Sequence, residues 1–202
     1  MMWVKICGIK RVEDAIAAVQ FGTDAIGFVF AESPRMVAID EAERISREVG
    51  DSVLKVGVFS DSPIDVVKDV ARRCRLDLVQ FHGSESPEYC EEFGGMAIKA
   101  IRIRDDSIPF GISAYKCFAV LLDARPGIDK EPCSFDWSLA RSLSGKVRLI
   151  IAGGLNPLNV AKLIRNVRPF GVDASSGVEI SPGVKDKSLM KEFIREAKGA
   201  LC

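Results

Sequence analysis

Short apolar runs recur along the chain, and each is followed by a segment in which apolar residues return at helical spacing. The runs are rich in Val, Ile and Phe and end at Gly, Ser, Pro or Asp, as strands that lead into turns do. Their nearly continuous apolar character indicates burial on both faces, which is typical of a parallel sheet covered by helices. The eight predicted strands span 3–7, 25–30, 53–59, 78–81, 97–101, 118–122, 147–151 and 171–174.

The segments between these strands predict amphipathic helices, because their apolar residues lie on one helical face. The pattern is clear in 64–71 and in 160–167. A capping residue precedes a proline at three predicted helix starts, which places the proline at the first helical position: Ser62-Pro63, Ser86-Pro87 and Asn156-Pro157. The segment 107–114 is the weakest predicted helix, since Pro109 and Gly111 oppose helix formation.

Eight strand and helix units without a long linker predict an α/β fold, a single-domain (β/α)8 TIM barrel spanning residues 1–202, in preference to an open doubly wound sheet. A chain of 202 residues with 48% hydrophobic residues can bury one such core. In these barrels the active site lies at the C-terminal ends of the strands. We therefore expect the chemistry of this chain to be concentrated there.

The charge balance narrows the choice of partners. The chain has 28 basic and 28 acidic residues, so no overall positive field is available to bind nucleic acid or an anionic membrane surface. No apolar run approaches the length of a membrane span and the N-terminus has no signal-peptide pattern, so we expect a cytoplasmic protein. Six cysteines without a C-x-x-C pair, and a single histidine, predict packing roles in place of a zinc site.

The residues at or just past the strand ends are rich in reactive and anion-binding types. They are Cys7, 33–35, 59–61, His82, Arg102, Asp123, 153–154 and 175–177. Gly153-Gly154 offers bare backbone N–H groups before a predicted helix start, and Ser175-Ser176-Gly177 adds hydroxyls after the last strand. The loops after strands seven and eight are the usual phosphate site of barrel enzymes, so these residues predict a phosphorylated small-molecule substrate. The alternative is that the glycines only turn the chain.

Cys7 and Asp123 are the candidate pair for proton transfer. They end strands one and six, which a barrel can direct across its mouth at a common ligand. A thiol serves as a general base if its pKa is lowered, and a carboxyl serves as a general acid if its pKa is raised. Burial as a small hydrophobe is the structural alternative for Cys7, and a cap of a helix or loop is the alternative for Asp123.

The segment Lys5-Ile6-Cys7-Gly8-Ile9 resembles the opening signature of the phosphoribosylanthranilate isomerases. The likeness continues in family order over essentially the whole chain, through 27–30 with 33–35, 56–59, 79–83, 121–123, 135–137, 152–160 and 173–179. The resemblance implies a cofactor-free and metal-free enzyme of tryptophan biosynthesis. Its reaction would be an Amadori rearrangement of N-(5-phosphoribosyl)anthranilate to 1-(o-carboxyphenylamino)-1-deoxyribulose 5-phosphate.

The resemblance also implies roles for individual residues. Asp123 would protonate the furanose ring oxygen and Cys7 would remove the proton on C2 of the sugar. Arg35 would pair with the anthranilate carboxylate, and the alternative for it is a surface salt bridge. His82 and Asp173, at the predicted mouth, would orient the substrate or neighbouring groups, and the alternative for His82 is a structural role. The phosphate site would comprise Gly153, Gly154, Ser175, Ser176 and Gly177. We expect a monomer or a homodimer.

One loop departs from the family pattern. Many family members carry a glycine-rich stretch after the strand-six aspartate, whereas the corresponding loop 124–134 has one glycine, Gly127. Its prolines and charged residues predict a stiffer and more polar flap.

Other functions fit parts of this pattern, since barrels with the same terminal phosphate site include epimerases, aldolases and synthases. A ribulose-phosphate epimerase would need metal-binding histidines, and His82 is the only histidine. A Schiff-base aldolase would need a lysine at a strand end, for which Lys99 qualifies if its strand points it inward. A barrel that only binds a sugar phosphate would be indifferent to the substitutions Cys7→Ser and Asp123→Asn.

Overall fold

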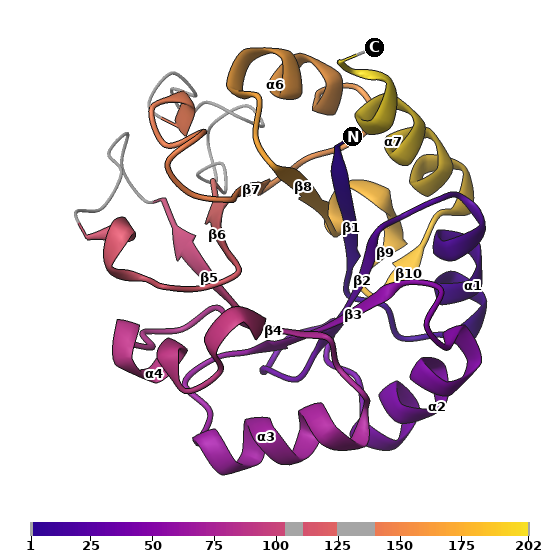
Figure 1. Cartoon of the computed structure of the whole chain (residues 1–202). Helices are drawn as coiled ribbons and strands as arrows, with labels where there is room; N and C mark the ends of the chain where they lie inside the picture. Colours follow the sequence, from indigo (N-terminus) through magenta and orange to yellow (C-terminus); the bar gives the residue numbers. More distant parts are fainter. Residues whose placement is uncertain (1, 104–110, 125–139, 202) are drawn as a thin grey trace.

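The computed structural model describes residues 2–103, 111–124 and 140–201. Eight parallel strands close into a barrel in which each strand pairs with the next and β8 pairs with β1 (Figure 1). The strands are β1 Trp3–Cys7, β2 Ala25–Val29, β3 Leu54–Phe59, β4 Leu78–Phe81, β5 Ala97–Arg102, β6 Ala119–Asp123, β7 Leu149–Ala152 and β8 Gly171–Ala174. All eight predicted strands are confirmed, and their ends differ from the prediction by two residues at most.

Helices surround the barrel on its outside (Figure 1). They are α1 Val12–Gln20, α2 Ile39–Val49, α3 Ile64–Arg73, α4 Pro87–Glu91, α6 Val160–Val167 and α7 Lys187–Gly199, with short 3-10 turns η1 Gly94–Met96, η2 Ile112–Ala114 and η3 Ser176–Val178. The weak helix predicted at 107–114 is reduced, within the described residues, to η2. Its earlier part lies outside them.

One of the three predicted helix starts is correct. Ser86 caps α4 by accepting a hydrogen bond from Tyr89 N, and Pro87 is the first helical residue. The other two predictions were wrong. Pro63 itself precedes α3 without a side-chain cap, and α6 begins at Val160 because the turn before it is held by Asn156 and Asn159.

Alternating side chains divide the strands between two cores. The larger core lies between the barrel and its helices and includes Phe28, Phe59 and Phe81. The smaller core lies inside the barrel and comprises Trp3, Ala25, Val56, Leu78, Ile98, Ala100, Ala119, Leu121, Ile150 and Ala152. Because side chains alternate along a strand, the residues that follow these at a spacing of two also point inward, toward the C-terminal mouth.

The opposite end of the barrel is covered by aromatic rings. Trp3 stacks on Phe170, Phe170 meets Phe118 edge to face, and the guanidinium of Arg148 lies over both phenylalanine rings. This apolar and cationic cover leaves the C-terminal mouth as the place where polar groups can gather around a ligand.

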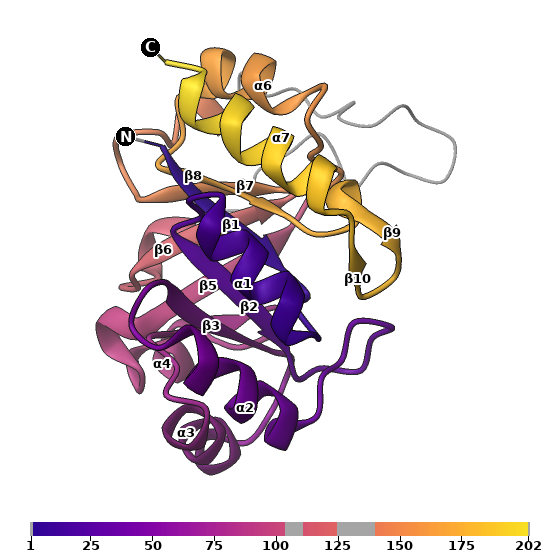
Figure 2. The ribbon, with the colours of Figure 1, turned by 90° about the vertical axis from the view of Figure 1, so that its right-hand side faces the viewer.

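A two-stranded antiparallel hairpin, β9 Glu179–Ser181 and β10 Val184–Lys185, follows η3. In the side view it projects on the side away from the chain's N-terminus, as does the loop between β2 and α2 (Figure 2). Within the described ranges no helix is long and apolar enough to cross a membrane.

Candidate active site

A cavity of about 790 Å³ opens at the C-terminal mouth of the barrel. Its wall includes Cys7 from β1, Asp123 from β6, and residues of the loops that follow β2, β7 and β8. Of the predicted site residues it brings together Cys7, Arg35, His82, Asp123, Gly153, Gly154, Asp173, Ser175 and Ser176. The predicted convergence on one cavity is therefore observed for every site residue except Gly177.

Cys7 is almost fully buried, with 8% of its surface exposed, and it borders the cavity. Burial raises the pKa of its thiol, and the carboxylate of Asp173 acts in the same direction. The ammonium groups of Lys5 and Lys185 oppose this rise without cancelling it. The thiol of Cys7 therefore does not have the lowered pKa that was expected of a general base.

Asp123 lies at the end of β6 and is 5% exposed. Its Oδ2 is 3.2 Å from Nε2 of His82, at the distance but not in the alignment of a hydrogen bond. His82 follows β4, and its backbone N–H donates to Phe59 O, which holds the backbone of His82 at the mouth. The strand order places β7 and β8 between β6 and β1, so Asp123 and Cys7 approach the cavity from separate directions.

A charged network lies in the barrel interior beneath the cavity. The Lys5 ammonium donates to Asp173 Oδ2 at 2.8 Å and to Gln80 Oε1 at 3.1 Å. Burial lowers the pKa of Lys5, but attraction to Asp173 and Cys7 outweighs it, so the net pKa is raised. Burial raises the pKa of Asp173, and the ammonium of Lys5 offsets this rise only in part. The short Nζ–Oδ2 contact still identifies an ion pair, because two opposite charges in contact compensate each other for the hydration that both lose on burial.

Arg35 reaches the cavity wall from the loop after β2, where its guanidinium binds Glu179 in a bidentate manner. Its Nε and Nη2 donate to the two carboxylate oxygens at 2.7 to 3.0 Å. Lys185 donates to the same carboxylate at 2.8 Å. Burial works to raise the pKa of Glu179, but the hydrogen bonds from Arg35 and Lys185 outweigh it and hold that pKa below its usual value.

The loops after β7 and β8 come into close contact beside the cavity. Gly153 has a φ of 99°, and a Cβ there would overlap the backbone of Ala124. A Cβ on Gly177 would overlap the carbonyl oxygen of Leu155. Gly177 therefore allows the two loops to approach each other and does not itself line the cavity. Because α6 begins only at Val160, the glycine pair does not lead directly into a helix, contrary to the prediction.

Three buried polar atoms on the cavity wall have no hydrogen-bond partner among the described residues. They are Nε2 of His82, Oδ1 of Asp173 and Oγ of Ser175. Buried polar atoms in folded proteins are nearly always hydrogen-bonded, so unpaired ones on a cavity wall indicate a polar ligand.

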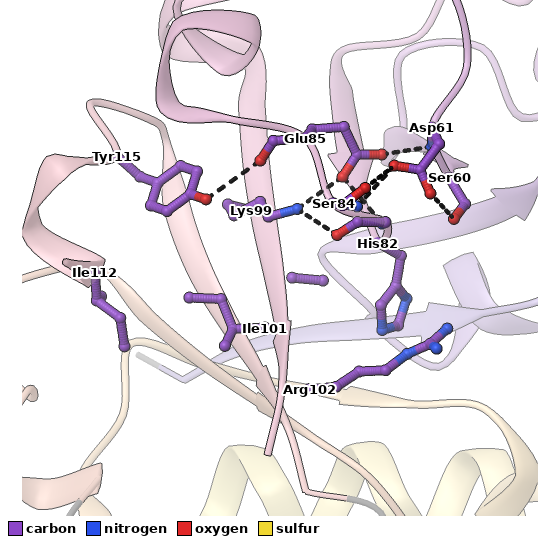
Figure 3. Close-up of a pocket in the computed structure, with 12 residues that line it drawn as sticks. Ser60, Asp61, His82, Ser84, Glu85, Lys99, Ile101, Arg102, Ile112 and Tyr115 are labelled. Atoms are coloured by element: carbon purple, nitrogen blue, oxygen red, sulfur yellow. Dashed lines mark hydrogen bonds and ion pairs between the residues drawn. The ribbon is translucent and has the colours of Figure 1, made fainter. Parts of the chain in front are cut away.

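A smaller cavity of about 470 Å³ adjoins the first and shares Ser60, His82 and Arg102 with it. Figure 3 shows Lys99 in this region, with its ammonium bound to Glu85 Oε2 at 2.7 Å and to Gly83 O at 2.8 Å. Lys99 alternates with the inward-facing Ile98 and Ala100, so it points out of the barrel. Lys99 therefore lacks the inward orientation that a Schiff-base lysine would need.

Two other predicted strand-end residues lie outside the larger cavity. Phe59 stacks on Phe30 in the outer core. Asp61 accepts hydrogen bonds from the backbone N–H and the hydroxyl of Ser84. The loop 124–134, predicted to be a stiff flap, lies outside the described residues apart from Ala124.

The family model described as N-(5'-phosphoribosyl)anthranilate isomerase matches residues 4–196. The chain belongs to this family. It is 46% identical to the N-(5'-phosphoribosyl)anthranilate isomerase of Trichlorobacter lovleyi over the whole of both chains, and 44% identical to that of Pelobacter propionicus, with 98% of this chain and 96% of the relative covered.

Solved structures of the isomerase family have the same fold. The Thermotoga maritima phosphoribosyl anthranilate isomerase matches with a TM-score of 0.91 at 42% identity, covering 98% of this chain and all of that one. A family structure in complex with reduced 1-(o-carboxyphenylamino)-1-deoxyribulose 5-phosphate matches with a TM-score of 0.88 at the same identity and coverage. A third, from Thermotoga maritima, concerns monomers generated from a dimeric isomerase, with a TM-score of 0.88, 40% identity and the same coverage.

Four polar residues around this isomerase-family site were not singled out as site residues from the sequence: Lys5, Gln80, Glu179 and Lys185. Lys5 carried a usable signal, because a lysine within a short apolar strand needs a buried partner. Glu179 and Lys185 carried none, since they lie in a hairpin whose position over β1 is decided by tertiary packing.

Glu179→Gln should lower the free energy of unfolding at pH 7 by about 1–3 kcal/mol, because the charge shared by Arg35 and Lys185 is lost. The folded-state pKa of Glu179 is lowered, so its contribution is complete above the unfolded value near 4.5 and is lost as the pH falls through the folded value. Urea unfolding of both proteins between pH 7 and pH 3.5 should therefore show a difference that shrinks toward acid.

Glu192→Gln is the matched control, because this exposed glutamate pairs with the exposed Arg195 on the same helix and should change stability by less than about 0.5 kcal/mol. An equal loss for Glu179→Gln at both ends of the pH range would contradict a role for its charge.

Proposed function

We propose that this protein isomerises N-(5-phosphoribosyl)anthranilate to 1-(o-carboxyphenylamino)-1-deoxyribulose 5-phosphate by an Amadori rearrangement, in the cytoplasm, as a step of tryptophan biosynthesis. One observation carries the proposal: a thiol and a carboxyl group border a single cavity whose wall also contains the loops after β7 and β8. The cavity volume of about 790 Å³ is in the range of small-molecule sites.

In the proposed mechanism Asp123 is the general acid. Its carboxyl protonates the furanose ring oxygen, the ring opens, and the anthranilate nitrogen forms a protonated Schiff base with C1. The neighbouring His82 lies 3.2 Å from the carboxylate and helps to orient it. The 5% exposure of Asp123 limits competing proton exchange with bulk water.

Cys7 is the general base in this mechanism. Its thiolate removes the proton from C2, and the electron pair moves into the Schiff base to give an enolamine. Loss of the proton on O2 and protonation of C1 then give the ketone. The iminium nitrogen acidifies C2, so the protein has to supply positioning and proton transfer only, without a cofactor or metal.

The phosphate is assigned to Gly153, Gly154, Ser175 and Ser176, while Gly177 holds the two loops close together behind them. Backbone N–H groups at the two glycine turns and the two serine hydroxyls suit a dianion, and the close contact between the loops keeps both in place. The unpaired Oγ of Ser175 supports this assignment, since it needs a partner from a ligand.

Arg35 is assigned to the anthranilate carboxylate. Glu179 occupies the Nε and Nη2 side of the guanidinium, and the five donors of an arginine leave others for a second carboxylate. Asp173, with Oδ1 unpaired at the cavity wall, is assigned to a substrate hydroxyl. The protein works as a monomer or a homodimer.

The aldolase alternative is weaker. Lys99 points away from the mouth and is held by Glu85, and Lys5 is fully buried below the cavity wall, between Asp173 and Gln80. Neither amine can reach a sugar carbonyl in the cavity, whereas the isomerase mechanism uses groups that border it.

The proposed reaction is tested by adding the protein to freshly prepared phosphoribosylanthranilate and following the loss of anthranilate fluorescence. Substrate and product are isomers of equal mass, so the product is identified by chromatography after borohydride trapping of the ketose. We expect turnover without added metal, unchanged by a chelator. Substrate that decays only at the rate of the protein-free mixture would reject the proposed function.

Cys7→Ala and Asp123→Asn should each lower kcat at least about a hundredfold, the usual scale for loss of a general base or acid, while the fold is retained. The same fluorescence assay measures kcat, and circular dichroism checks folding. Cys90→Ala is the matched control, because this buried cysteine packs in the outer core and should leave kcat unchanged. Full activity in either variant would remove that residue from the mechanism.

Arg35→Ala should raise KM by about ten- to a hundredfold with little change in kcat, since a charge-assisted hydrogen-bonded contact to the bound substrate is lost. Arg35→Lys, which keeps the charge but not the planar fork, should fall between the two proteins. Steady-state kinetics over a range of substrate concentrations measures both constants, and a decrease confined to kcat would contradict the assigned role.

A further inference from the structure

Lys5 lies directly beneath Cys7 in the barrel interior. The two residues are separated by one position on β1, so both side chains point inward. A Cβ built on Gly27 would be 2.8 Å from Cys7 Sγ and 3.0 Å from Lys5 Cε. The sulfur and the end of the lysine chain therefore meet over the bare Cα of Gly27 in the neighbouring strand β2.

The hydrogen bonds of Lys5 leave one N–H of its ammonium without a partner among the described residues. An ammonium carries three N–H groups, and two of them donate to Asp173 and Gln80. Lys5 has no exposed surface, so solvent does not take the third. The Cys7 sulfur lies beside the end of the lysine chain across Gly27, and its anionic form and the ammonium attract each other.

Charged groups surround Cys7 from every side of the mouth. Lys5 and Lys185 are positive and nearby, and Arg35 contributes a more distant positive charge that Glu179 largely offsets. Asp173 is negative, and the carboxyl group of Asp123 lies further round the mouth beside His82. Each lysine is paired with a carboxylate, but Lys5 lies on the same strand as Cys7 and next to its sulfur across Gly27. Lys5 is therefore the cation whose position relates most directly to the sulfur.

We propose that Lys5, held by Asp173 and Gln80, is a positioning residue for the Cys7 base, and that its fixed positive charge favours the anionic form of the sulfur. This inference rests on the proposed function only in assigning Cys7 the role of base. Lys5 stays protonated throughout: the proton from C2 of the substrate goes to Sγ, and the ammonium stabilises the thiolate before that transfer.

The network offsets the main obstacle to using a buried thiol as a base. Burial disfavours the charged sulfur, and an opposite charge held beside it, away from bulk solvent, counteracts that effect. Gln80 and Asp173 keep the ammonium in place, so no reorganisation is needed when the thiolate forms. Gly27 is part of the arrangement, because any side chain there would separate the two groups.

The test measures the thiol itself. Lys5→Met keeps the length of the side chain and removes its charge. Alkylation of Cys7 by iodoacetamide, followed by peptide mass spectrometry between pH 6 and pH 10, should shift its midpoint to higher pH and become about tenfold slower or more at neutral pH. The acid limb of kcat/KM should move in the same direction, so that activity recovers in part at alkaline pH.

Two controls separate this effect from general damage. Lys99→Met also removes a buried lysine of a barrel strand from an ion pair, but the Lys99 side chain lies on the outer face of the barrel. This substitution should leave the pH midpoint of Cys7 alkylation unchanged. Cys74 and Cys90 are internal references, because burial raises the pKa of each to about 11 and their alkylation should stay slow in every variant. A folded Lys5→Met protein with the wild-type Cys7 midpoint overturns the proposal.

Gly27→Ala decides the question if Lys5→Met does not fold, since Lys5→Met leaves Asp173 buried without its partner. The added methyl group lies between Sγ and Cε while both charges remain, and Gly27 has no positive φ that would strain an alanine. We expect its Cys7 midpoint to rise as well, and an unchanged midpoint overturns the proposal. Retained kcat in Cys7→Ala would instead reject the base role alone, because the alkylation profile does not depend on turnover.

Discussion

The pairing of β1 with β8 closes the barrel, and the site depends on it. This pairing sets Lys5 beside Asp173 and Trp3 beside Gly171, although the partners are about 168 positions apart in the chain. Gly171 has no room for a side chain because Trp3 packs against its Cα. Once the register is fixed at this seam, alternation along each strand determines which residues point into the barrel and which reach the mouth.

Electrostatic balance among charged groups with little solvent exposure is the second constraint. The thiol of Cys7, the carboxylates of Asp173 and Glu179 and the ammonium groups of Lys5 and Lys185 lie in and around one cavity. Burial acts to raise the pKa of the thiol and the carboxylates and to lower the pKa of the ammonium groups. Pairing resolves most of the cost: Lys5 with Asp173, and Lys185 with Glu179. The atoms that pairing leaves unsatisfied, on Asp173 and Ser175, face the cavity and are the natural contacts of a polar substrate.

The hairpin β9–β10 links the mouth of the barrel to its stability. It brings Glu179 and Lys185 over the end of β1, where Glu179 anchors Arg35 from the loop after β2. An arginine fixed in this way loses less conformational entropy when it binds a carboxylate than one free in solvent. The same contacts that order the loop therefore prepare the place assigned to the anthranilate group.

The sequence by itself determined the eight strands, the barrel and the family, because each strand is a compact apolar run whose signal is local, and because motifs such as 5–9 and 152–157 recur in family order. It also placed Cys7, Asp123 and the two glycine turns at the strand ends. It misplaced the start of α3, where Pro63 itself is the cap position, and that of α6, where the turn hydrogen bonds of Asn156 and Asn159 precede the helix. Only the tertiary structure decided that Lys99 points outward, that Gly177 serves loop contact, and that Lys5 lies under Cys7. The physical reason is that orientation and ion pairing follow from strand register and barrel closure, which join residues far apart in the chain.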